Sequence, residues 1–508
     1  MSATALVSAV PAVAQTSQAS SAASDDDTVS ALIRLLVGRG TITQAEGDAL
    51  VSAAKTRAPR SAVAQTAPTV QTGPVAAVVP TQQVAQAGTG APGLRQEAPG
   101  TPNPSVAAPA PASSAVLVKA AGGNGLTVDW SEGAPKFVSP GGFTFRPRGR
   151  VLIDAQTTTG SRYDPRNITT TGTRALRLGV EGTYGPNVFY QFEADFADAG
   201  TEVTSAYFGW RQKLSSDITT EVSLGSRLTE RGIDGSTGSD QTPFLERNAV
   251  GVGLIPLKGF FGLGVTSKTF GPNWHFTALV VGEAINGSSN SNDTWTAQFR
   301  GHWNPIKTKD GLIHLGGWGY HENFSEAITA LTLNTREANR YNDNIRVFAG
   351  PLGAPDHADA YGVEAGGTYK GLWAFGEYGQ RNITFRSATG LPRSDLKAWS
   401  VSSGLMLTGE KAPFAPRGGT FTLPQVNNPI TAGGWGAAEV LLRYEETDYS
   451  DTQQGGTGHA LTGGVNWYLN DISRVMFNWI HFETNNRAGD FTGPDTGDTF
   501  ATRFQISF

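Results

Sequence analysis

The sequence predicts an all-β protein: a transmembrane antiparallel β-barrel of about 16 strands, preceded by a short N-terminal helical segment and a disordered linker. Three observations support this fold class. Many segments alternate between apolar and polar side chains, as strands do when one face meets lipid. The connections between those segments alternate between tight turns and long loops. Runs of about 18 apolar residues are missing, so no transmembrane helix is expected.

Composition fits this fold class and excludes several others. The mean hydropathy of -0.24 is compatible with a membrane barrel, because only alternate residues of its strands meet lipid. The chain of 508 residues contains 0 Cys, so disulfides, thiol catalysis and thiolate metal sites are excluded. Its formal net charge of -5 argues against a nucleic-acid partner.

Residues 1–14 predict a signal peptide. The segment is short and apolar and ends in an A-x-A-like cleavage site, Ala12 to Ala14. A positively charged start is missing. We therefore expect the true start to lie upstream of Met1, because a barrel must be exported. The alternative is a tail of small residues.

Residues 25–55 predict a periplasmic helical hairpin or coiled coil. Three Asp residues open the segment, and apolar side chains between Val29 and Val37 then fall on one stripe. Thr43 and Glu46 form a capping box that starts a second short helix. Two short amphipathic helices cannot cover their own apolar stripes, so we expect them to pair with copies of themselves.

The barrel is predicted over residues 143–508. Before it, residues 58–114 are rich in Ala and Pro with almost no charge, which predicts an extended linker. In the last stretch the even positions from Phe500 to Phe508 are mostly apolar, and the odd positions are small or polar. The same alternation predicts sixteen strands, at residues 143–155, 174–184, 187–197, 203–213, 218–227, 261–270, 273–284, 293–303, 311–323, 359–370, 372–386, 396–408, 433–448, 457–469, 473–485 and 497–508.

The lengths of the connections predict which end of the barrel faces the periplasm. Tight turns such as Gly185-Pro186 and Lys370-Gly371 alternate with longer connections, of which residues 228–260 and 324–358 are the longest. Short turns at one end, which faces the periplasm, and long loops at the other are typical of outer-membrane barrels. The connection 409–434 is long although it lies at the short-turn end.

Six short motifs occur along the predicted barrel: GRVLID (149–154), RLGVEG (177–182), FLERN (244–248), LTGEK (407–411), WGAAEVLLRY (435–444) and VNWYLN (465–470). In order and spacing, from about residue 143 to Phe508, they resemble the phosphate-selective porin family, of the porin O and P type. The resemblance implies a sixteen-stranded trimeric pore in the bacterial outer membrane, often with an N-terminal periplasmic coiled coil. A closing strand that ends in Phe508 also resembles the signal read by the barrel-assembly machinery.

Arginines on the inward strand faces are the candidate site residues. Arg146, Arg148 and Arg150 share one face of their strand, opposite the apolar side chains. An arginine facing lipid at the midplane costs about 2–4 kcal/mol, so this face must line the lumen. Guanidinium groups bind phosphate bidentately, and arginine rings favour anions in pores. Alternatively, they pair with inward Glu and Asp and only brace the wall. The anion-path candidates are Arg146, Arg148, Arg150, Arg177, Arg211, Arg227, Arg231, Arg300 and Arg443.

Together these features predict an outer-membrane porin for passive diffusion of small anions, phosphate or polyphosphate first. The family's third long loop builds the pore constriction. Here residues 228–260 contain no Tyr and one Lys, so the alternative is a general-diffusion porin without phosphate preference. A third possibility is a barrel that anchors an envelope tether. The seven His are scattered and no nucleophile-base pair is evident, so we expect no enzyme, metal or cofactor.

Overall fold

The computed structural model describes residues 125–130, 133–197, 200–286, 293–338, 340–386 and 393–508, together with Gln44. The signal peptide, helical hairpin and linker predicted for the N-terminal part lie outside the described residues, apart from Gln44. The chain forms two units, Met1–Thr81 and Gln82–Phe508, and all the described strands belong to the second. No helix in the described part of the chain is long and apolar enough to cross a membrane.

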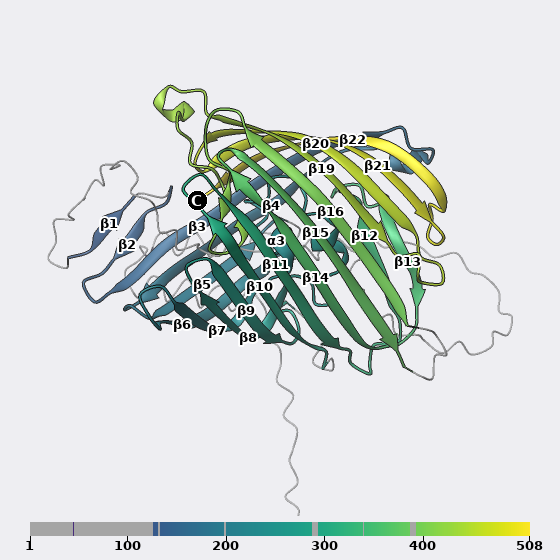
Figure 1. The fold of residues 1–508 in the computed structure, drawn as a ribbon, viewed down its shortest axis with the longest axis horizontal. Helices are drawn as coiled ribbons and strands as arrows, with labels where there is room; N and C mark the ends of the chain where they lie inside the picture. Colours follow the sequence, from purple (N-terminus) through teal and green to yellow (C-terminus); the bar gives the residue numbers. More distant parts are fainter. Residues whose placement is uncertain are drawn as a thin grey trace, which may run out of the picture. The chain divides into compact units, whose positions relative to one another are not determined.

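Sixteen antiparallel strands form a closed barrel (Figure 1), which confirms the predicted fold class. The last strand, β22 (Gly493–Ser507), pairs with the first, β3 (Phe143–Thr159), so the sheet has no free edge. Every predicted strand overlaps one of the observed strands. The others are β4 (Thr169–Tyr184), β5 (Val188–Asp195), β6 (Glu202–Lys213), β7 (Thr219–Leu228), β8 (Phe261–Phe270), β9 (Trp274–Val281), β10 (Trp295–Lys307), β11 (Gly311–Asn323), β14 (Pro355–Tyr369), β15 (Leu372–Phe385), β16 (Ser394–Met406), β19 (Ala437–Asp448), β20 (Thr457–Asn470) and β21 (Ser473–Asn486).

Side chains alternate along the strands as the sequence predicts. On β22, Phe500 and Phe504 are exposed on the outer face, whereas Ala501, Arg503 and Gln505 are buried inside. Apolar side chains on the outside and charged ones within invert the usual arrangement of a globular protein. The outer face contacts lipid instead of water, and this explains why its side chains are apolar.

The C-terminal residue extends the seam between β22 and β3. The backbone N–H of Phe508 donates to the Gly149 carbonyl at 2.9 Å, and the Gly149 N–H donates to the Phe508 carbonyl at 2.9 Å. A Cβ at Gly149 would lie 2.7 Å from Cζ of the Phe508 ring, so a larger residue here would force that ring to move. Recognition of Phe508 by the assembly machinery stays a prediction.

Three short hairpins were not predicted; two of them have strands of only two or three residues, too short to show an alternation. The first extends the barrel sheet beyond the start of β3 through the pair Phe137↔Phe145. The other two fold within long connections, one at each end of the barrel. The hairpins are β1 (Thr127–Asp129) with β2 (Lys136–Val138), β12 (Leu331–Arg336) with β13 (Arg346–Leu352), and β17 (Phe414–Ala415) with β18 (Thr420–Phe421).

Candidate functional site

Residues 229–260, here called the constriction loop, join β7 to β8 and fold into the barrel. The loop contains two short helices, α3 (Gly232–Ser236) and α4 (Ala249–Gly253), and Figure 1 shows α3 among the strands of the wall. Nearly all of its side chains are buried. Its buried backbone N–H groups need partners, and the barrel wall supplies several of them.

Carboxylates on the wall hold the constriction loop. Glu377 on β15 accepts a hydrogen bond from the backbone N–H of Ile233 at 2.5 Å. Glu445 on β19 accepts one from the N–H of Ala249 at 2.7 Å. The starts of both helices are therefore fastened to the wall, which fixes the loop across the lumen.

The β17–β18 hairpin, residues 414–421, enters the lumen from the short-turn end and meets the constriction loop. The Phe414 ring stacks on Phe375 of β15 with ring centroids 4.7 Å apart. The backbone N–H of Phe421 donates to Oγ1 of Thr237 in the constriction loop at 3.1 Å. Connections from opposite ends of the barrel therefore contact each other inside it. This explains why the connection 409–434 is long.

Three predicted arginines converge on one carboxylate. Glu193 of β5 is buried and lies 3.1 Å from Arg148, 3.4 Å from Arg150 and 3.3 Å from Arg177. Arg150 also pairs with Asp240 of the constriction loop at 2.5 Å. The structure thus places these arginines on the lumen side of the wall and ties them to carboxylates.

Arg146 and Arg211 are more accessible. Both lie near the short-turn end, and their side chains are 20% and 31% exposed. Arg146 lies 3.6 Å from Glu181, and Arg211 lies 2.7 Å from Glu221. Their charges therefore face the open part of the lumen more than those around Glu193 do.

The other four predicted arginines are buried against wall or loop groups. Arg231 has no described carboxylate in ion-pair distance; it donates to Thr229 Oγ1 at 3.1 Å, and its guanidinium lies 5.2 Å from the centre of the Phe260 ring. The remaining pairs are Arg227 with Glu221 (3.6 Å), Arg300 with Glu364 (2.7 Å) and Arg443 with Glu445 (3.1 Å).

A cluster of arginines that the sequence analysis missed surrounds a cavity of about 150 Å³ between the constriction loop and the β12–β13 hairpin. We call this cavity the arginine pocket. Among the described residues that line it, Glu246 is the only carboxylate. Glu246 lies 2.8 Å from Arg174 and 3.8 Å from Arg340. The arginines that line the pocket are Arg174, Arg247, Arg336, Arg340, Arg346 and Arg381.

Burial and neighbouring arginines lower the pKa values of two arginines in the pocket. Burial, together with the neighbouring Arg346 and Arg340, lowers the pKa of Arg336 to about 10. Burial also lowers the pKa of Arg247 to about 10. Both side chains remain cationic at neutral pH, so an anion in the pocket would offset the repulsion that Arg340 exerts on each of them.

The sequence carried one signal for this pocket. Arg336, Arg340 and Arg346 lie close together in the long connection 324–358. Loop residues have no periodic pattern that indicates which way they face, so the cluster emerges only when the β12–β13 hairpin folds toward the constriction loop.

The fold brings three of the seven histidines close together. His275, His302 and His314 form a column on neighbouring strands, with ring centroids 5.4 and 4.9 Å apart. No group of His, Asp and Glu among the described residues is arranged to hold a metal ion.

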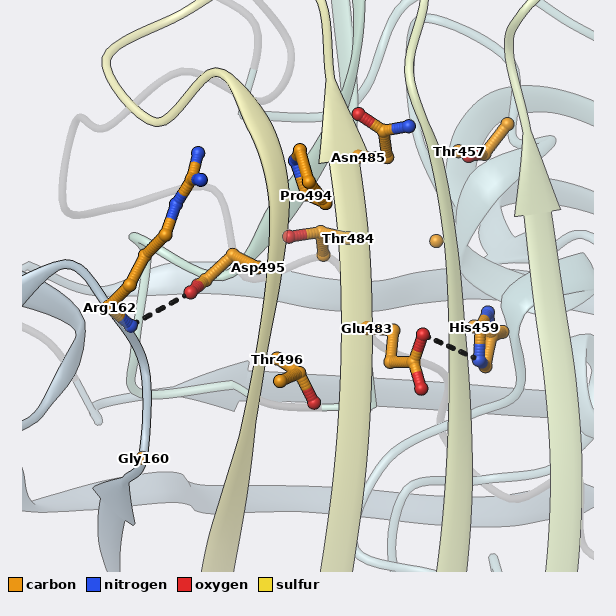
Figure 2. A pocket seen from close by; sticks show the side chains of 11 residues that line it. Gly160, Arg162, Thr457, His459, Glu483, Thr484, Asn485, Pro494, Asp495 and Thr496 are labelled. Atoms are coloured by element: carbon orange, nitrogen blue, oxygen red, sulfur yellow. Dashed lines mark hydrogen bonds and ion pairs between the residues drawn. The ribbon is translucent and has the colours of Figure 1, made fainter.

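A second cavity, of about 520 Å³, lies at the long-loop end of β20 to β22 (Figure 2). His459 and Glu483 on its wall are 3.5 Å apart. They lie on the same strand faces as the exposed Val465 and Phe477. The second cavity therefore borders the outer surface of the barrel. For this reason the candidate site is the lumen and not this cavity.

A closed barrel with a lipid-facing apolar surface, a charged lumen and an inward-folded loop defines the class of outer-membrane porins. The family model for phosphate-selective porin O and P matches residues 145–508, and the chain belongs to this family. It is thus a protein of the bacterial outer membrane. Family and barrel indicate a channel rather than an enzyme.

Similar proteins include two curated sequences. An uncharacterised protein of Caulobacter vibrioides is 24% identical over 370 residues, covering 69% of this chain and 71% of the relative. Porin O of Pseudomonas aeruginosa is 23% identical over 407 residues, covering 72% of this chain and 89% of the relative. A solved structure, the anion-selective porin from Comamonas acidovorans, is 14% identical with a TM-score of 0.42, covering 72% of this chain and 100% of that one.

Proposed function

We propose that this porin passes small anions by passive diffusion, with phosphate the first solute to test. The observation that carries the proposal is the arginine pocket, where six guanidinium groups and one carboxylate line the same small cavity. Asp343 and Glu322 pair with three of these arginines, but the cations still outnumber the described carboxylates, and this excess of positive charge raises the local concentration of anions. The name of the relative porin O and of the family supports phosphate as the test solute.

Cations at both ends of the lumen support a path for anions. The arginine pocket lies beside long connections, whereas Arg146 and Arg211 lie near the short-turn end. Arg148, whose side chain is 12% exposed, continues the row from Arg146. Several weak sites in series let an ion enter and leave, which conduction requires.

The predicted arginines divide into two groups in this proposal. Arg146, Arg148 and Arg211 guide anions, because their side chains reach open space. Arg150 and Arg177, the more deeply buried arginines beside Glu193, brace the wall, because a buried charge must be paired.

Competition between chloride and phosphate tests the proposal. We expect inorganic phosphate to reduce the chloride current through single channels in planar bilayers while chloride is still in excess. A general-diffusion porin would show no such competition. In that case the pore would pass anions without preferring phosphate.

The assembly of the protein is a further part of the proposal. We infer a homotrimer in outer-membrane lipid, as the family resemblance implies. Removing residues 15–115 tests whether the predicted helical hairpin adds to trimer stability. If channel formation were lost altogether, the N-terminal segment would be part of the channel, and if conductance were absent from the intact protein, the barrel would be an envelope anchor.

A further inference from the structure

We infer that the arginine pocket binds small organic acids, which carry one or two carboxylates on an apolar body. This inference rests on the proposed anion channel. It names the class of solute that binds at the long-loop end of the barrel. Inorganic phosphate offers only the charge. The pocket offers an apolar surface as well.

The apolar part of the pocket comes mainly from the constriction loop. Val252, Ile255, Leu257 and Phe260 line the same cavity as the arginines, and Leu333 of β12 adds to them. A hydrated inorganic anion gains nothing from these side chains. An organic acid buries apolar surface against them, and that contact adds to the attraction of its carboxylate.

Half of the cationic part comes from the opposite element. Arg336, Arg340 and Arg346 belong to the β12–β13 hairpin and its turn, whereas the other three arginines lie on β4, on the constriction loop and on β15. The cavity therefore offers guanidinium groups beside an apolar surface. A solute with a charged head and an apolar body matches both, whereas a solute with charge on all sides matches only one.

Two of the hairpin arginines share a carboxylate partner that a solute can replace. Arg336 lies 3.0 Å from Asp343, to which Arg346 also donates a hydrogen bond. The Asp343 side chain is 58% exposed, so this ion pair is solvated and contributes little stability. Both arginines donate to the single oxygen Oδ1 of Asp343, whereas a solute carboxylate offers two oxygens and can bind a guanidinium bidentately.

The size of the pocket restricts the solute. At about 150 Å³ the cavity is smaller than the roughly 300–1,000 Å³ of sites for drug-sized ligands. Guanidinium groups also stack on aromatic faces, so an aromatic carboxylate of one ring fits the chemistry of the site. Benzoate is therefore the probe, and acetate offers the same head group without the body.

The test compares four solutes as inhibitors of the chloride current through the full-length protein in planar bilayers. We expect benzoate to halve the current at a concentration about tenfold below that of acetate, because of its buried apolar surface. Inorganic phosphate should act more weakly than benzoate. Benzyl alcohol, which has the ring without the charge, should have no effect.

Variants separate the two parts of the pocket. The double substitution Arg336→Gln with Arg340→Gln should weaken inhibition by benzoate and acetate alike, about tenfold. Leu333→Asn should weaken inhibition by benzoate and leave acetate unchanged. Arg393→Gln is the matched control, because that side chain is 57% exposed and pairs with Asp395.

The outcomes distinguish this inference from the proposed function. If acetate or phosphate inhibits the wild-type channel at least as well as benzoate, or benzyl alcohol inhibits like benzoate, the inference is overturned. The comparison uses wild-type protein, so it stands even when a variant fails to assemble. If the wild-type channel prefers cations, the proposed function itself is overturned.

Discussion

Arg503 of β22 holds Asp154 of β3 in a bidentate ion pair across the seam that closes the barrel. Nε lies 2.7 Å from Oδ1, and Nη2 lies 2.7 Å from Oδ2. Both side chains are buried, and Arg503 also lies 3.6 Å from Glu246 of the constriction loop. The first strand, the last strand and the loop therefore meet at one guanidinium.

Replacing Arg503 by Gln should weaken the closed barrel. Asp154 would remain buried without its partner, and breaking such a pair costs about 3–5 kcal/mol. We expect the unboiled protein to lose its folded electrophoretic mobility at a lower temperature than wild type. Arg393→Gln should leave that temperature unchanged, and an equal temperature for Arg503→Gln would show that the seam does not depend on this pair.

Substitutions of accessible arginines should change anion preference, whereas substitutions of buried arginines should change the unfolding temperature. Arg146→Gln combined with Arg211→Gln removes the two most exposed of the predicted charges, so it should reduce anion preference while the barrel stays stable. Arg150→Gln should instead lower the unfolding temperature, because Glu193 and Asp240 lose a buried partner. Reversal potentials and temperature series on the same preparations measure both quantities. Equal effects of the two substitutions would contradict the division into guiding and bracing groups.

Glu337, in the turn that joins β12 to β13, should make this loop sensitive to pH. Burial and the neighbouring Glu445 raise the pKa of Glu337 to about 8; Glu446 adds to this, and Arg443 opposes it. The folded loop therefore holds a proton that the unfolded loop releases at lower pH, so stability falls as pH rises toward and through 8.

Proteolysis of the loop at pH 6 and pH 9 measures this effect. We expect faster cleavage within residues 331–352 at pH 9, because Glu337 is then ionised beside Glu445. Glu337→Gln should remove the difference between the two pH values. A wild-type loop that is equally protected at both would show that the proton does not stabilise it.

The strands could be predicted from the sequence because lipid imposes a period of two on them. Phe500 and Arg503 must face opposite sides of β22, and this constraint applies to every strand of the barrel. The ends of the strands follow less directly from the sequence. β4 begins at Thr169 instead of residue 174, since its first five residues are Thr and Gly and show no alternation of apolar and polar side chains.

The candidate site was predicted in part. Periodicity placed Arg148 and Arg150 inside, but it cannot show that Glu193 of another strand binds both. That contact depends on the register between strands. The pocket around Arg336 and Arg340 depends on how two loops fold, and loop residues carry no alternating pattern.

The reversal potential under a potassium chloride gradient tests the central claim most directly. We predict that the wild-type channel prefers chloride, and that the preference declines as ionic strength rises and screens the arginines. Substituting Arg336, Arg340 and Arg346 together by Gln should remove much of the preference in channels that still assemble. A wild-type channel that prefers potassium, or shows no preference at low salt, would contradict the account.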